Sequence, residues 1–168
     1  QGQTMAQAEK MEDIASECLV RIAEVAALQG DAAQALELLV PAQKALKACS
    51  HVWGLATLFL LRAQCQLALG QLAQASASIV SARQAAKQAN AQHIALRIER
   101  ENARIAEKSS DLAQALQSLK AAAALQTELD RGSKAHLLRH LQTLAEQSSA
   151  AERELPGYSM GVRRKLSR

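Results

Sequence analysis

One short phrase occurs three times in this chain at an interval of 40 residues. The stretch GDAAQALELL begins at Gly30, GQLAQASASI begins at Gly70, and SDLAQALQSL begins at Ser110. A fixed period of this length is typical of helical hairpins that stack on one another, because a single hairpin cannot bury its apolar face alone. The period therefore limits the chain to a stacked array.

Other positions repeat at the same spacing. Three columns hold alanine in every copy, one holds a large apolar residue and one holds the turn residue: Ala23, Ala63 and Ala103; Ala35, Ala75 and Ala115; Ala42, Ala82 and Ala122; Leu39, Ile79 and Leu119; Gly30, Gly70 and Ser110. Small residues on facing sides let two helices approach closely, and the large residue fills the remaining gap. The pattern predicts one helical hairpin used three times.

The turn inside each hairpin can be predicted from its own residues. Glycine tolerates positive φ at Gly30 and Gly70. Asp31 and Asp111 come directly after the turn, where a carboxylate can cap the next helix. Ser110 stands where the two glycines stand, so we expect the third turn to have no strict need for positive φ.

The composition supports an all-α fold. Ala, Leu, Gln, Glu, Lys and Arg favour helices, whereas the aromatic and β-branched residues that favour strands are scarce. We expect one helical repeat domain over residues 1–154, followed by a flexible basic tail over residues 155–168. The hairpins are expected at about 14–50, 51–90 and 91–130, and the helices at about 6–28, 31–48, 52–69, 71–89, 92–108 and 111–129, with a capping helix at 133–154.

Charge is distributed unevenly along the chain. Residues 131–168 carry eight Lys or Arg against three Asp or Glu, whereas residues 1–130 carry 12 against 13. The segment RRKLSR near the end has three open interpretations: a solubilising end, a nuclear-import patch, or a kinase site at Ser167, where phosphate would reverse the local charge. Nucleic-acid binding is not expected, because the basic residues lack interleaved aromatic residues.

The sequence shows no catalytic machinery. It contains no nucleophile-and-base arrangement, phosphate-binding loop or metal signature, so we expect no enzyme activity, no cofactor or metal, and no small-molecule substrate. His136 and His140 lie four residues apart, which is the spacing of a metal-binding helix face. No Glu or Cys joins them within that turn, so we interpret them as solvated histidines.

The cellular setting is predicted from cysteines and hydropathy. Cys18, Cys49 and Cys65 are odd in number and widely spaced, which indicates small buried side chains in a reducing compartment. No apolar run approaches the roughly 18 to 20 residues that span a bilayer. The chain shows no signal peptide, and its first residue is Gln1, as in a fragment or a processed product. We expect an intracellular protein, cytoplasmic or nuclear, with no membrane partner.

The repeated columns resemble the tetratricopeptide repeat (TPR) superfamily over roughly residues 14–130. That family has a small residue midway in its first helix, glycine at the turn and alanine twice in its second helix. The period here is 40 residues instead of about 34, and the family's aromatic positions are mostly aliphatic or polar. The resemblance implies a right-handed α-solenoid of about three TPR-like hairpins plus a C-terminal capping helix.

Two narrower resemblances imply different functions. ASECLVRIAEVAALQGDAAQALELL and GLATLFLLRAQCQLALG are similar to the C-terminal TPR region of the subunit 5 family of the anaphase-promoting complex. That resemblance implies a non-catalytic scaffold in a ubiquitin ligase of the cell cycle. LLRHLQTLAEQSSAAERE is similar to the connecting helix after the TPR sensor regions of bacterial regulators and cyclases. That alternative implies a sensor or regulatory domain.

TPR proteins bind extended or helical segments along a concave face formed by the first helix of each repeat. Carried over by position, that face selects three groups of residues: Glu17, Val20 and Glu24; Thr57, Leu60 and Gln64; Arg97, Arg100 and Arg104. The three arginines form one helical stripe that suits carboxylate or phosphate groups. Expected partners are therefore other proteins, through acidic or extended segments or as neighbouring subunits. The alternative is a solvated face that Glu101 and Glu107 partly neutralise.

Overall fold

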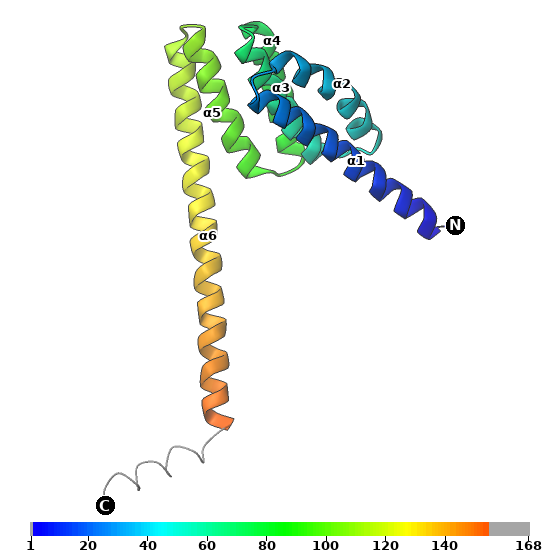
Figure 1. The fold of residues 1–168 in the computed structure, drawn as a ribbon. Coiled ribbons are helices and arrows are strands. Elements are labelled where there is room, and N and C mark those ends of the chain that lie inside the picture. Colours follow the sequence, from blue (N-terminus) through cyan, green and yellow to red (C-terminus); the bar gives the residue numbers. More distant parts are fainter. Residues whose placement is uncertain (1, 155–168) are drawn as a thin grey trace, which may run out of the picture. The chain divides into compact units, whose positions relative to one another are not determined.

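The computed structural model describes the backbone of residues 2–154 and the side chains of residues 15–147. Within that range the chain forms only α-helices and the turns between them, which confirms the all-α class (Figure 1). The helices are α1 (Gly2–Leu28), α2 (Ala32–Ala48), α3 (Val52–Ala68), α4 (Leu72–Gln88), α5 (Gln92–Lys108) and α6 (Leu112–Glu154). The predicted tail and its Ser167 lie outside the described residues.

The helices of the first unit pack as neighbours along the chain. The chain divides into two compact units, residues 1–127 and residues 128–168. In the first unit α1 contacts α2, α2 contacts α3, α3 contacts α4 and α4 contacts α5, and α3 also contacts α1 and α5. Three-residue turns join these helices, so consecutive helices run antiparallel. The central helix is α3, because it contacts α1, α2, α4 and α5.

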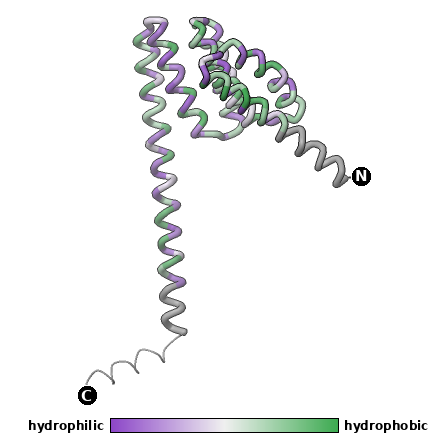
Figure 2. The backbone as a smooth tube through the Cα atoms, in the orientation of Figure 1, coloured by the Kyte–Doolittle hydropathy of each residue, from purple (hydrophilic) through white to green (hydrophobic). Residues whose placement is uncertain are grey.

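The repeated alanines form the tightest part of the core. All nine are buried, none more than 5% exposed. The large apolar column fills the space between them in the first two hairpins, where Leu39 and Ile79 are 0% and 1% exposed. Figure 2 shows apolar residues interleaved with polar ones along these helices, as expected of helices that bury one face only.

The expectation for the third turn is wrong, because Ser110 adopts positive φ. Its φ is 61°, close to the 74° of Gly70. The backbone hydrogen bonds explain this conformation. The Ser110 N–H donates to the Glu107 carbonyl over 3.1 Å, and the Gly70 N–H donates to the Leu67 carbonyl over 3.0 Å. Identical helix-ending bonds impose the same left-handed residue, at a cost of roughly 1–2 kcal/mol for serine.

Both predicted helix caps are confirmed. The Asp31 carboxylate accepts a hydrogen bond from the Gln34 N–H over 2.9 Å, and the Asp111 carboxylate accepts one from the Gln114 N–H over 3.0 Å. Each bond satisfies one of the N–H groups that a helix leaves unpaired at its start. These caps mark where the second helix of the first and third hairpins begins.

The predicted break after residue 129 is absent, and α6 is one helix of 43 residues. The expected helices ended at residue 129 and began again at residue 133, which leaves Asp130, Arg131 and Gly132 between them. None of these residues forbids helix, however. Glycine in a helix costs only about 1 kcal/mol relative to alanine, and proline, which breaks helices, is missing from this stretch. The separate capping helix expected at 133–154 is therefore the continuation of α6.

Polar side chains connect each hairpin to the next at equivalent positions. From α3, Arg62 Nη2 donates to Gln43 Oε1 on α2 over 2.7 Å. Forty residues after Gln43, Arg83 on α4 forms two hydrogen bonds with the Glu99 carboxylate on α5, at 2.6 and 2.7 Å. The hydrogen bond to Glu99 raises the pKa of Arg83 above its ordinary value. The second helix of each of these hairpins is thus tied to the first helix of its successor.

A pair of glycine variants separates backbone conformation from packing. Gly70 has positive φ, Gly132 is helical, and an added Cβ meets no atom within 4 Å at either position. We expect Gly70→Ala to lower the free energy of unfolding by about 1–2 kcal/mol, because alanine is strained at positive φ. Gly132→Ala should raise helix stability by about 1 kcal/mol. Circular dichroism during urea unfolding measures both, and equal effects would contradict the assigned conformations.

Candidate interaction groove

A groove of about 740 Å³ lies across the first helices of the three hairpins, within the first unit. Its lining combines apolar and charged side chains. The lining residues are Glu24, Ala27, Leu28, Ala32, Leu61, Gln64, Cys65, Leu67, Ala68, Arg97, Glu101, Arg104, Glu107 and Lys108. They come from α1, α3 and α5, with Ala32 from the start of α2.

The groove contains about half of the residues predicted for the concave face. Glu24, Gln64, Arg97 and Arg104 line it together. Since Glu24, Gln64 and Arg104 occupy the same column of the repeat, stacking has brought equivalent positions side by side. This column of the repeat therefore lies on one shared surface.

The remaining predicted residues lie elsewhere. Glu17, Val20 and Thr57 line a separate hollow of about 20 Å³ between α1 and α3. Arg100 donates through Nη2 to Gln126 Oε1 on α6 over 3.2 Å instead of lining the groove. Leu60 is only 1% exposed and belongs to the apolar core, so its side chain is not available to a partner. Its assignment to the binding face is therefore wrong.

The expected cationic stripe is offset by a buried carboxylate. Glu101 is 4% exposed, and its Oε2 lies 3.3 Å from Arg104 Nη1 and 3.4 Å from Gln64 Nε2. Glu24 is paired with Arg21 over 2.7 Å. Among the described side chains Arg97 has no ion pair and is exposed. The groove thus combines acidic and basic groups, and Arg97 and Lys108 are its cations without an ion pair among the described side chains.

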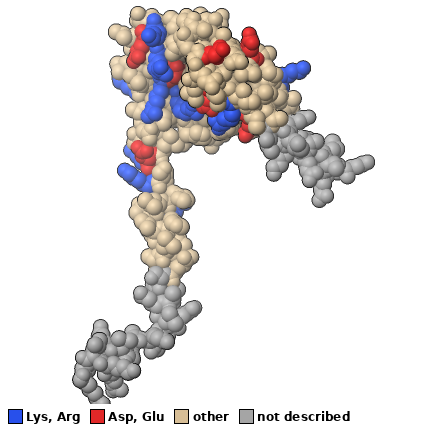
Figure 3. All heavy atoms as spheres, in the orientation of Figure 1, with Lys and Arg blue, Asp and Glu red and all other residues tan. Residues whose placement is uncertain are grey.

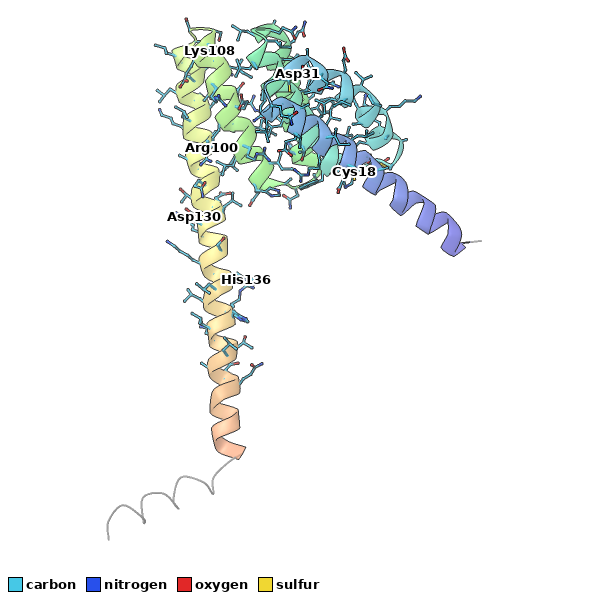
Figure 4. The ribbon with its side chains drawn as sticks, viewed as in Figure 1. Cys18, Asp31, Arg100, Lys108, Asp130 and His136 are labelled. Atoms are coloured by element: carbon cyan, nitrogen blue, oxygen red, sulfur yellow. The ribbon has the colours of Figure 1, made fainter. Side chains whose placement is uncertain are left out.

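Figures 3 and 4 place these charges on the molecule. Figure 3 shows Lys and Arg side chains close to Asp and Glu side chains over the hairpins, with no single sign covering the face. In Figure 4, Lys108 lies at the end of α5 next to the turn into α6, and Arg100 lies two turns earlier on the same helix.

The residues predicted for the binding face do not include the last turn of the first helix of each hairpin, which also lines the groove. Two further columns line the groove in all three hairpins: Ala27, Leu67 and Glu107; Leu28, Ala68 and Lys108. The sequence could have identified these positions, because they recur at the same 40-residue spacing and come just before the turn. Leu28 is 83% exposed, which makes it the most accessible large apolar side chain of the described residues.

The groove offers little chemistry of its own. Burial raises the pKa of the Cys65 thiol, which keeps it protonated and weakly nucleophilic. Cys65 is buried as expected, but Cys18 is exposed and Cys49 only half-buried (Figure 4 labels Cys18), so that prediction holds for one cysteine of three. Among the described residues, no three His, Cys, Asp or Glu side chains come together as a metal site.

His136 and His140 are both exposed on α6, as predicted. None of the helices, over the residues described, combines the length and the apolar character needed to cross a membrane.

Comparison with known proteins identifies no relative of this chain. No family model, no curated protein and no solved structure matches the chain.

The buried carboxylate in the groove gives a test of what Glu101 contributes. Its equivalent in the preceding hairpin is Leu61, and a buried ion pair stabilises a fold little compared with an apolar side chain of similar volume. We expect Glu101→Leu to leave the free energy of unfolding unchanged or raise it by about 1 kcal/mol, because Arg104 is mostly exposed and can turn to water. A loss above about 1 kcal/mol in urea unfolding would show that the pair is structural.

Proposed function

We propose that this chain is a non-catalytic protein-interaction scaffold that binds a segment of another protein in the groove across α1, α3 and α5. The observation that carries the proposal is that all three first helices contribute equivalent positions to one hollow. A continuous surface built from successive repeats is how solenoid proteins bind extended partners. The function therefore belongs to the array rather than to a single hairpin.

The proposal includes the TPR-like architecture implied by the repeated columns. Two features support a right-handed α-solenoid: the antiparallel packing of successive helices, and the contacts of α3 with both α1 and α5. The subunit 5 resemblance adds a narrower proposal, a scaffold inside the anaphase-promoting complex, which is supported by sequence alone. The proposed setting is intracellular.

The lining of the groove indicates the chemistry of the partner segment. Leu28 and Leu67 provide apolar surface for one or two large side chains of the partner. Arg97 and Lys108 provide cations without ion-pair partners among the described side chains. A helical or extended segment with apolar anchors flanked by carboxylates satisfies both features.

A second function is favoured by one observation, the unbroken α6. A helix of 43 residues that starts in the last hairpin and continues past it suits a sensor domain that transmits to an effector. The parent gene discriminates the two proposals. An effector domain encoded after residue 168 would favour the sensor, whereas neighbouring helical repeats would favour the scaffold.

Peptide display on the immobilised full chain tests the groove directly. We expect selected peptides to combine leucine or isoleucine with Asp or Glu. The double variant Arg97→Glu and Lys108→Glu should weaken their binding by about tenfold or more, because it places carboxylates opposite carboxylates. Fluorescence anisotropy measures the affinities.

The matched control for that test is Arg139→Glu, which reverses an exposed arginine of α6 outside the groove. This variant should bind the same peptides as the unmodified chain. Selected peptides that bind the groove variant and the unmodified chain equally would overturn the proposed site.

A further inference from the structure

Glu101 is the most buried of the charged side chains that line the groove, and its hydrogen bonding is incomplete. Its side chain is 5% exposed, and its Oε2 lies 3.3 Å from Arg104 Nη1 and 3.4 Å from Gln64 Nε2. Hydrogen bonds between charged groups are commonly about 2.7–2.9 Å long. Glu101 Oε1 accepts no hydrogen bond from any described residue. A buried carboxylate thus has two long contacts on one oxygen and none on the other.

A second carboxylate on α5 shows complete hydrogen bonding in the same fold. Both oxygens of Glu99 accept hydrogen bonds from Arg83, at 2.6 and 2.7 Å, although the Glu99 side chain is 15% exposed. The more exposed carboxylate is therefore the better satisfied of the two. A carboxylate has about four acceptor positions and loses water on burial, so an unbonded oxygen is unfavourable at a buried site. Glu101 lacks a donor that the described part of the chain does not supply.

The unbonded oxygen of Glu101 is open to the groove. Among the described side chains, only His51 Nδ1 is both fully buried and without a hydrogen bond. Glu101 Oε1 also has no hydrogen bond, so it must keep some accessible surface, and Glu101 lines the groove. A donor that enters the groove can therefore reach this oxygen.

The fold does not need a carboxylate at this position of the repeat. The equivalent residue of the second hairpin is Leu61, which is 7% exposed and belongs to the apolar cluster of α1, α2 and α3. The equivalent of the first hairpin is Arg21, which is exposed and pairs with Glu24. An apolar side chain thus meets the packing needs of this position. A ligand explains the buried carboxylate of Glu101 better than the core does.

The charges around Glu101 favour an uncharged donor. Arg97 and Arg104 lie about one turn before and one turn after Glu101 on α5, and both line the groove. Two guanidinium groups at this spacing repel a lysine or arginine of a partner, whereas a neutral N–H is not repelled. The groove as a whole adds no net charge, because its charged lining residues are three acids and three bases: Glu24, Glu101, Glu107, Arg97, Arg104 and Lys108.

Main-chain N–H groups are uncharged donors that every protein segment carries. In a helix these groups are bonded within the helix, except in the first turn, so they are not available to Glu101. In an extended segment, an N–H that points toward the groove is free to donate. The acceptor in the groove therefore suits an extended segment and does not suit a helical one.

We infer that Glu101 holds the main chain of the bound segment, because its Oε1 accepts a hydrogen bond from one main-chain N–H of an extended partner. This inference rests on the proposed function, and it decides between the helical and extended forms that the apolar and cationic lining allows. Arg97 and Lys108 select acidic side chains of the partner. Glu101, which lies between them on α5, fixes the position of the partner's backbone.

Backbone N-methylation of a bound peptide tests the inference. The probe is the tightest peptide that display selects on the immobilised full chain, synthesised as a series with one N-methyl group at each non-proline residue in turn. We expect one position at which N-methylation weakens binding to the unmodified chain by about tenfold or more, because it removes the donor to Glu101. Isothermal titration calorimetry measures each affinity.

Two variants connect that peptide position to Glu101. In Glu101→Leu the same N-methyl group should weaken binding by less than about twofold, because the acceptor is already missing. Glu101→Gln keeps a side-chain oxygen that accepts hydrogen bonds, so the sensitivity to N-methylation should remain. The control Glu37→Leu removes an exposed carboxylate of α2 outside the groove and should also keep the sensitivity.

The outcomes separate this inference from the proposed function. If Arg97→Glu with Lys108→Glu weakens the peptides, but no N-methyl group loses its effect in Glu101→Leu, the inference is overturned and the scaffold proposal stands. The same holds if Glu101 couples to a side chain of the peptide, or if the peptide binds as a helix by circular dichroism. Cover of the groove by residues 128–168 of the same chain also leaves no sensitive position and overturns the inference. If display selects no peptide, both proposals fail.

Discussion

The structure depends on alanine at the surfaces where the two helices of a hairpin meet. Nine alanines at three repeated positions are buried, and their small side chains set how closely each pair of helices approaches. Close approach lets Leu39 and Ile79 fill the space that remains, and it brings the first helices near enough to form one groove. A larger residue in an alanine column would separate the helices of its hairpin, and the groove would change with them.

The sequence allowed the all-helical fold and most helix ends to be predicted, because the same local pattern occurs three times. Helix limits at 28, 48 and 108 agree with the structure, and the caps at Asp31 and Asp111 are those expected. The two errors lie where competing backbone states differ little in free energy. A helical glycine such as Gly132 costs only about 1 kcal/mol relative to alanine, and serine at positive φ costs about 1–2 kcal/mol. Tertiary packing and backbone hydrogen bonds determine the conformation at these two positions, and neither can be inferred from the local sequence.

The site was harder to predict than the fold because it depends on which side of each helix is exposed. Leu60 and Gln64 are one turn apart on α3, yet the first is in the core and the second lines the groove. Arg97 and Arg100 are separated in the same way, one in the groove and the other bonded to Gln126 on α6. The positions carried over from the family lie on the three helices that line the groove, but which of their residues line it depends on the side of each helix that is exposed.

The three-residue turns have a consequence for how this chain changes length. The turn within a hairpin and the turn between hairpins have the same number of residues, and Gly30, Ser50, Gly70, Asn90 and Ser110 all take positive φ in them. A block of 40 residues therefore begins and ends at equivalent junctions. Duplication or loss of such a block preserves every local connection and alters only the number of hairpins and the extent of the groove. Genetic variation in length is thus tolerated at the backbone, and selection acts on the surface that each added block contributes.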